Sequence, residues 1–79
     1  MNESRRKEIT EIISDVYALR ERIEQVKGQE QEAFENLPES LQRSELGEEM
    51  EEVVNSLDSL DDDLENVIIA LTEAKGEVW

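Results

Sequence analysis

The sequence predicts an all-α protein, an antiparallel two-helix hairpin of the coiled-coil type that oligomerises into a helical bundle. Three observations predict this fold. Apolar residues recur at alternating steps of three and four in both halves of the chain, as in packed helices. The single proline, Pro38, stands near the midpoint. The 79 residues include no cysteine and no histidine, and they allow one domain with a small core.

The first half of the chain predicts a helix over about residues 4–36. With Ile9 taken as heptad position a, the a and d positions are almost all apolar. Glu30 is the one charged residue among them, and we expect it to fix the register or to thin the packing near the helix end. The a residues are Ile9, Val16, Ile23, Glu30 and Leu37, and the d residues are Ile12, Leu19, Val26 and Ala33.

The second half predicts another helix, over about residues 45–77, with an unbroken heptad pattern. Such a strict repeat of 3.5 residues implies left-handed supercoiling against a partner helix. The apolar residues of this pattern are Leu46, Met50, Val53, Leu57, Leu60, Leu64, Val67, Leu71, Ala74 and Val78.

Residues 37–44 predict the corner between the helices. Pro38 disfavours the α conformation of Leu37, so the first helix should end near Asn36. Pro38 can also begin a single helical turn, because the amide hydrogen that it lacks would be unpaired there. Ser44 is then the expected N-cap of the second helix.

Two helices of equal length and a short corner predict an antiparallel hairpin, with residues 1–79 forming one domain. In its register Arg20 lies beside Asp61. Because one seam between two helices rarely folds stably alone, we expect a second interface that joins copies of the chain into a homo-oligomer. Apolar residues outside the a and d positions nominate this interface: Ile13, Tyr17, Val54, Ile68 and Ile69.

The net charge of −14 is unevenly distributed. Residues 1–27 hold six acids and six bases, so residues 28–79 hold the other 16 of the 22 acids, against only Arg43 and Lys75. This charge disfavours direct binding to nucleic acid or to an anionic membrane. The longest apolar run, residues 67–71, is far shorter than the roughly 20 residues that span a bilayer. With no leader pattern after the basic start, we expect a cytoplasmic protein.

Acidic residues recur every three to four positions along the predicted second helix, which places a negative charge about every 5–6 Å. Two interpretations stay open. The acids either imitate a nucleic-acid backbone toward a basic protein, or form a solvated face that keeps a short bundle soluble. The acidic surface of the first interpretation comprises Glu48, Glu51, Glu52, Asp58, Asp62 and Glu65.

The cations and the one tyrosine lie mostly on the predicted first helix. If an oligomer gathers them, they would line an inter-subunit pocket for an anionic nucleotide, with arginine forks on phosphate and the tyrosine stacked on a base. The alternative is ion pairing within the bundle. The residues of this possible anion pocket are Arg5, Arg6, Tyr17, Arg20 and Arg22.

Catalysis and metal binding are not expected. The absence of histidine and cysteine removes imidazole and thiolate metal sites, thiol nucleophiles and histidine-based triads. Paired-carboxylate chemistry needs a pocket, which a rod of two helices does not supply. The acidic run 61–65 is no calcium loop, because Asn66 and Thr72 stand where a glycine and a glutamate are required. We therefore expect no enzymatic activity, no metal and no cofactor.

The corner and its flanks resemble a family of short acidic helical proteins encoded by phages and prophages of Gram-positive bacteria. The resemblance implies a phage origin and a small stoichiometric effector of a host component, or a part of a phage assembly complex, in the cytoplasm of the bacterial host. It implies no site residues. It is carried by Ala33-Phe34-Glu35-Asn36-Leu37-Pro38-Glu39-Ser40-Leu41-Gln42, Ser44-Glu45, Gly47-Glu48, Met50-Glu51-Glu52, and the opening Asn2 with Arg5-Arg6-Lys7.

The leading functional prediction is a non-enzymatic phage-type effector that binds and sequesters or inhibits a host component, such as one of antiviral defence, through its acidic surface. One alternative is a homo-oligomeric sponge for an anionic nucleotide signal. Another is a structural coiled-coil protein of an assembly. The expected partners are the chain itself and either a host protein or a small nucleotide.

Overall fold

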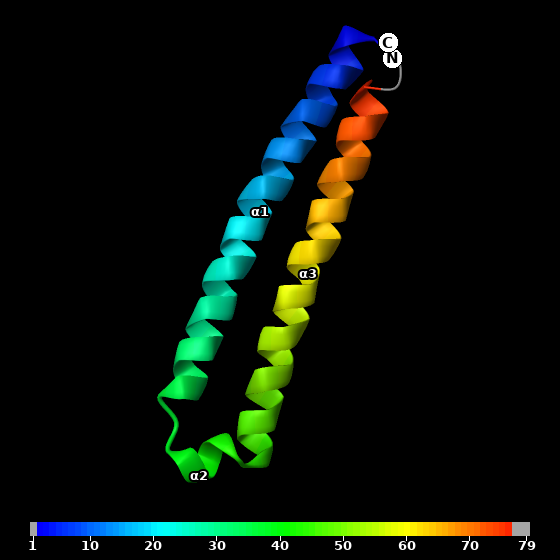
Figure 1. The fold of residues 1–79 in the computed structure, drawn as a ribbon. Helices are drawn as coiled ribbons and strands as arrows, with labels where there is room; N and C mark the ends of the chain where they lie inside the picture. The colour runs from blue at the N-terminus through cyan, green and yellow to red at the C-terminus, as the bar shows by residue number, and fades with distance from the viewer. Residues whose placement is uncertain (1, 77–79) are drawn as a thin grey trace.

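The chain forms an extended antiparallel hairpin of two long helices in a computed structural model, which describes residues 2–76 (Figure 1). Helix α1 spans Glu3–Glu35, the one-turn helix α2 spans Glu39–Gln42, and helix α3 spans Glu45–Gly76. The hairpin measures 59 × 15 × 11 Å, and α1 packs along α3. The all-α class and the antiparallel arrangement are therefore confirmed. Residue 77, the predicted end of the second helix, and the heptad residue Val78 lie outside the described residues.

Hydrogen bonds from side chains hold the ends of α1. The side-chain oxygen of Asn2 accepts the backbone N–H of Arg5 at 2.9 Å, which is an N-cap. At the other end, the side-chain amide of Gln42 donates to the carbonyls of Phe34 and Glu35, both at 3.3 Å, and of Leu37 at 3.0 Å. Phe34 and Glu35 end α1, where the regular hydrogen bonds of the helix stop, and the carbonyl of Phe34 also accepts the N–H of Leu37 at 3.1 Å. Gln42 therefore ties the corner to the end of α1.

The corner follows the proline. Pro38 is the N-cap of α2, and its carbonyl accepts the N–H of Gln42 at 3.0 Å, so a single turn does begin there. Helix α3 starts directly after Ser44, whose carbonyl accepts the N–H of Glu48 at 3.1 Å and whose hydroxyl donates to the carbonyl of Leu41. Ser44 thus stands at the predicted N-cap position.

The contact between α1 and α3 uses only one of the two predicted heptad stripes. One stripe contains a residues such as Val16 and Ile23 on α1 and the heptad residues Leu57 and Leu64 on α3, and it is half-buried between the helices. The other predicted stripe is exposed, so its placement in the seam was wrong. It contains the d positions, which are Ile12, Leu19, Val26 and Ala33 on α1 and, on α3, Leu46, Val53, Leu60, Val67 and Ala74. The residue that directly follows each d position lies in the seam instead. These residues are Ile13, Arg20, Lys27 and Phe34 on α1 and Gly47, Val54, Asp61, Ile68 and Lys75 on α3.

Charge and close approach explain this difference. The stripe in the seam contains Arg20 and Lys27 on α1, and it faces the acids of α3 that pair with them. It also contains Gly47, which allows α3 to approach the corner closely. Both stripes repeat every seven residues, so periodicity alone does not choose between them. Each helix is turned by roughly 50° from the predicted orientation.

The interior of a single hairpin is small. Among residues 2–76, Ile68, which is 7% exposed, is the one buried hydrophobic residue. The residues predicted for an oligomer interface divide into two groups. Ile13, Val54 and Ile68 lie in the seam between α1 and α3, whereas Tyr17 and Ile69 are exposed. Three of those five residues therefore pack within one hairpin.

Substituting the glycines tests the close approach at the corner. A Cβ at Gly47 would overlap the carbonyl group of Gln42, whereas a Cβ at Gly28 would meet nothing within 4 Å. We expect Gly47→Ala to lower the free energy of unfolding by about 1–3 kcal/mol through overpacking. The matched Gly28→Ala should raise it by about 1 kcal/mol, because alanine favours the helix. Thermal unfolding followed by circular dichroism measures both, and equal effects would contradict the contact.

Candidate interaction surfaces

The ion pair at the middle of the seam joins the two helices. The guanidinium of Arg20 donates from Nε to Oδ1 of Asp61 at 3.0 Å and from a terminal nitrogen to Oδ2 at 3.2 Å. It also lies 5.9 Å from the centre of the Tyr17 ring. The hydrogen bonds lower the pKa of Asp61 and raise the pKa of Arg20. The predicted neighbours Arg20 and Asp61 are therefore confirmed as a fork-like pair.

A second cation binds acids from both helices. The ammonium of Lys27 lies 3.0 Å from Oδ1 of Asp58 on α3 and 3.3 Å from Oε2 of Glu24 on its own helix. The hydrogen bond to Asp58, followed by the one to Glu24, raises the pKa of Lys27. Two of the six cations of α1 are thus committed to ion pairs across the seam.

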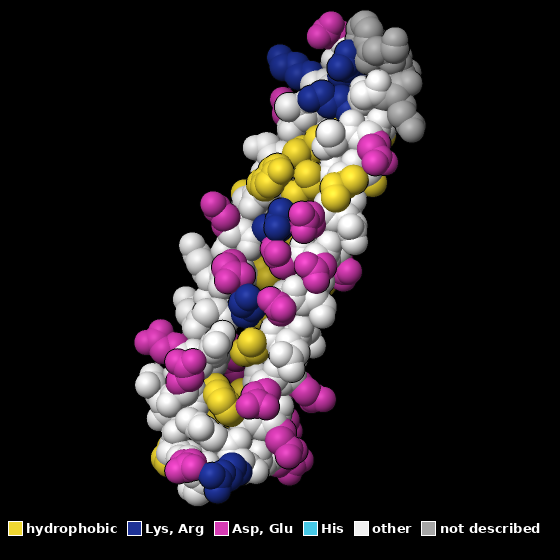
Figure 2. Space-filling model, in the orientation of Figure 1, with side chains coloured by type: hydrophobic (Ala, Val, Ile, Leu, Met, Phe, Trp, Pro, Cys, Tyr) yellow, Lys and Arg dark blue, Asp and Glu magenta, His cyan; other side chains and the backbone are white. Residues whose placement is uncertain are grey.

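A single hairpin does not bring the predicted anion-pocket residues together. Arg5 and Arg20 stand fifteen residues apart on α1, about 22 Å along the helix axis. Arg20 is bound to Asp61. At the open end of the hairpin, Arg6 and Lys7 lie beside Lys75 around a shallow hollow, where Figure 2 shows cations gathered. This cation group is separate from Tyr17, so base stacking and phosphate binding do not converge in one hairpin.

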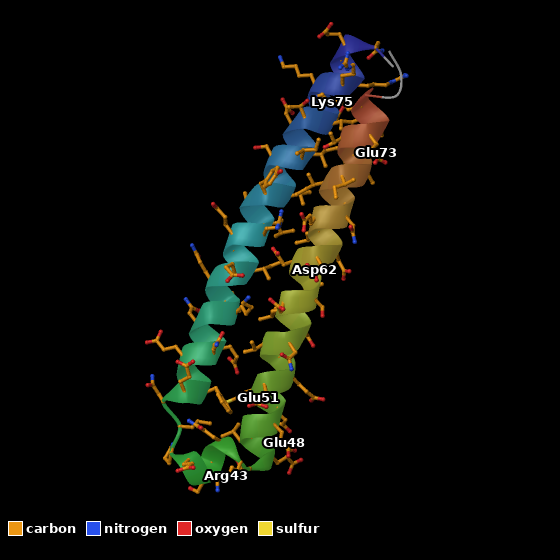
Figure 3. The ribbon with its side chains drawn as sticks, viewed as in Figure 1. Arg43, Glu48, Glu51, Asp62, Glu73 and Lys75 are labelled. Atoms are coloured by element: carbon orange, nitrogen blue, oxygen red, sulfur yellow. The ribbon has the colours of Figure 1, made fainter. Side chains whose placement is uncertain are left out.

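The predicted acidic surface is exposed along α3, and Figure 3 shows Glu48, Glu51 and Asp62 following one another on this helix. Successive helical residues are about 100° apart, so most of these acids share one side of α3. Glu52 is the exception, because it lines a hollow beside Val53. The acids of the shared side are Glu48, Glu51, Asp58, Asp62 and Glu65.

The exposed heptad stripes form a second surface, which we call the apolar face. Each of its large side chains is 41–52% exposed. Leu19 and Val26 of α1 line one hollow with Leu57, and Val53 of α3 lines another with the same Leu57, so the two stripes meet on one side of the hairpin. The apolar face comprises Ile12, Leu19 and Val26 on α1 and Leu46, Val53, Leu60 and Val67 on α3.

The acidic side of α3 and the apolar face point in opposite directions. On α3 the apolar face follows Val53 and Leu60, whereas the acids follow Glu51 and Asp58, two residues earlier in each heptad. Two residues correspond to about 200° around a helix. Figure 2 shows the acidic side, with cations of the seam between acidic side chains. The hairpin thus presents two chemically different surfaces.

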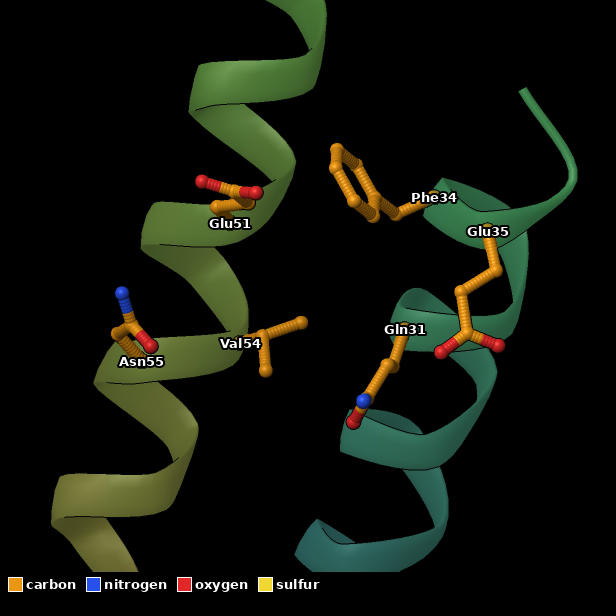
Figure 4. Close-up of a pocket in the computed structure, with 6 residues that line it drawn as sticks. All are labelled: Gln31, Phe34, Glu35, Glu51, Val54 and Asn55. Carbon is orange, nitrogen blue, oxygen red and sulfur yellow. The ribbon is translucent and has the colours of Figure 1, made fainter. Parts of the chain in front are cut away.

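A hollow near the corner is a gap in the packing of the two long helices. It measures about 260 Å³ and lies between α1 and α3 (Figure 4). Phe34 and Val54 point into the space between the helices, and the side chain of Asn55 points away from α1. The lining also includes Gln31 and the carboxylates of Glu35 and Glu51 but no amine. Ligand pockets are larger, from about 300 Å³ upward.

Comparisons with protein families, with curated proteins and with solved structures give no match. The resemblance of the corner to phage proteins therefore stays a prediction. Within residues 2–76, no helix is both long enough and apolar enough to cross a bilayer. Across the same residues, no three acidic side chains are grouped so that they would hold a metal ion.

The apolar face escaped sequence reasoning because its residues were assigned to the seam. The signal that locates the seam is the charge pattern. Arg20 and Asp61 stand at the same level of the hairpin, and both belong to the stripe that lies one residue beyond the d positions. Opposite charges that face each other across two helices indicate which stripe is shared. The more apolar stripe is then left outside.

The shifted pKa of Asp61 predicts a pH dependence. Because that pKa lies below the ordinary value of 3.8, the ion pair stabilises the hairpin fully above about pH 5, and its contribution is lost as pH falls through the lowered pKa. We expect Asp61→Asn to lower the melting temperature at pH 7, and we expect its difference from the wild type to shrink as the pH falls below 3.8. Thermal melts of both proteins at each pH measure this difference in melting temperature. Because the other acids are protonated equally in both proteins, their effect cancels in the difference. A difference independent of pH would contradict this prediction.

Proposed function

We propose that this chain is a non-enzymatic binding protein that sequesters a basic partner through the acidic side of α3. One observation carries the proposal. The acids of that side lie exposed along one helix at intervals of three to seven residues, and α3 has a single cation, Lys75, among eleven acids. Negative charges held along one side of a helix complement a basic groove of the kind that binds a nucleic-acid backbone.

The arrangement of the hairpin supports this proposal. Asp58 is partly neutralised by Lys27, but Glu51, Asp62 and Glu65 are exposed on the same side. The helix holds these carboxylates in place before binding, which reduces the ordering cost of association. In the setting that the phage resemblance implies, the partner is a basic protein of the bacterial host.

Neutralising the row tests this function. The triple variant Glu51→Gln, Asp62→Asn and Glu65→Gln removes three charges from the acidic side, and Glu11→Gln, Glu21→Gln and Glu32→Gln remove three exposed charges from α1 as a matched control. Each immobilised protein is incubated with bacterial lysate, the retained proteins are identified by mass spectrometry, and their affinity is measured by titration. We expect a basic protein that duplex DNA displaces, and about a 10-fold or greater loss of affinity in the α3 variant alone.

Two other results would contradict the proposal. Equal losses in both triple variants would show a response to net charge rather than to the acidic side. Retention of an anionic nucleotide in native mass spectrometry, unaffected by the α3 substitutions, would favour the sponge. Binding that weakens steeply with salt is the expected signature of the acidic side.

A structural assembly protein is a second candidate, and the apolar face favours it. Exposed apolar patches that extend along a whole molecule are uncommon on monomers and mark interaction sites. In this role the apolar face does the recognising and the acids keep the assembly soluble. Neutralisation of Glu51, Asp62 and Glu65 then leaves binding unchanged.

A further inference from the structure

We infer that the apolar face is the interface of a homodimer, in which two hairpins stack face to face as a four-helix bundle with both corners at the same end. The inference is independent of the proposed function, because the acidic side of α3 points the other way. Its occupant is a second copy of this chain.

The layers of the apolar face match those of a bundle core. Ile12 lies level with Val67, and Leu19 lies level with Leu60. The helices are antiparallel, so seven residues forward along α1 correspond to seven residues backward along α3. A second hairpin with its corner at the same end presents the same layers at the same heights. Helices that carry apolar residues at a, d and a neighbouring position are typical of such bundles, whereas a single seam uses two stripes.

The size of the face is sufficient for a stable dimer. The hairpin is 59 Å long and 15 Å wide. A face of these dimensions supplies the roughly 800 Å² that each partner contributes to a standard interface. Within the described residues 2–76 one hairpin buries a single hydrophobic side chain, Ile68. Covering the apolar face supplies the core that the isolated hairpin lacks.

Charge decides the orientation. Helix α1 carries nine acids and six bases, whereas α3 carries eleven acids and one base. With both corners at the same end, a two-fold axis along the bundle places each α1 over the partner's α3. With the corners at opposite ends, the same faces stack α3 on α3 and bring the two acid-rich helices together. Neighbouring helices are antiparallel in both arrangements, but only the first avoids this repulsion.

The first test is the mass in solution. Sedimentation should give twice the chain mass of 9.1 kDa. Leu19→Gln with Leu60→Gln should weaken the dimer by more than about 100-fold, because four buried leucines are lost per dimer. The matched control Tyr17→Gln with Ile69→Gln changes two exposed apolar residues outside the apolar face and should leave the dimer intact. Circular dichroism and the concentration dependence of the melting temperature separate dissociation from unfolding.

The second test is the orientation. The chain has no cysteine, so spin labels attach only at Ser40→Cys, an exposed position on α2. Pulsed electron spin resonance should give label distances below roughly 30 Å for corners at the same end. Distances near the 59 Å length of the hairpin would overturn the arrangement.

Salt separates this inference from the proposed function. Two chains of charge −14 repel each other, so added sodium chloride should strengthen the dimer while it weakens binding of a basic partner. A monomeric wild type with a cooperative melt, or a dimer that Leu19→Gln with Leu60→Gln leaves intact, would overturn the inference. Neither result bears on the acidic side of α3.

Discussion

The close approach of α3 to the corner is the constraint on which the rest of the hairpin depends. Gly47 is buried against the backbone of Gln42, and the side chain of Gln42 binds the carbonyls at the end of α1. The end of one long helix and the start of the other are thereby joined through one residue. This contact fixes which side of α3 faces α1, because every seventh residue after Gly47 follows the same side.

The contact of Gly47 with the corner determines which residues lie along the whole seam. The side that begins at Gly47 continues through Asp61 and Ile68, so the seam contains both the most buried apolar residue and the partner of Arg20. Ion pairs near a surface contribute little stability, and they mainly select register. A hairpin held in this way is specific in its pairing but poor in buried apolar area. Its most regular apolar stripe lies outside.

The acidic side of α3 and the apolar face are two separate surfaces of the hairpin. They are about 200° apart on the same helix, so one partner does not cover both. In the proposed dimer the apolar faces meet and the acidic sides point outward from two opposite layers. A dimer of this form presents the same acidic row twice, which raises the avidity for a partner with repeated basic sites.

The helices, the corner and the antiparallel arrangement were all predictable from the order of the amino acids. These depend on local signals, which are the heptad period, Pro38 and the capping residues, and they act within a few residues of one another. The sequence also placed Arg20 beside Asp61, since the register follows from the position of the corner.

The choice of the stripes that pack between α1 and α3 was not predictable in this way, because it depends on contacts between residues far apart in the chain. Each helix carries three candidate stripes at a period of seven, and two of them fit between a pair of helices. The choice depends on the approach of Gly47 to Gln42 and on charges that meet from opposite ends of the chain. For that reason Leu19 and Leu60, which pattern alone places in the seam, lie on the surface, while Ile13 and Ile68, predicted for contacts between subunits, lie inside the hairpin. The heptad period identifies the stripes of a helix, but it does not determine which stripe faces the neighbouring helix.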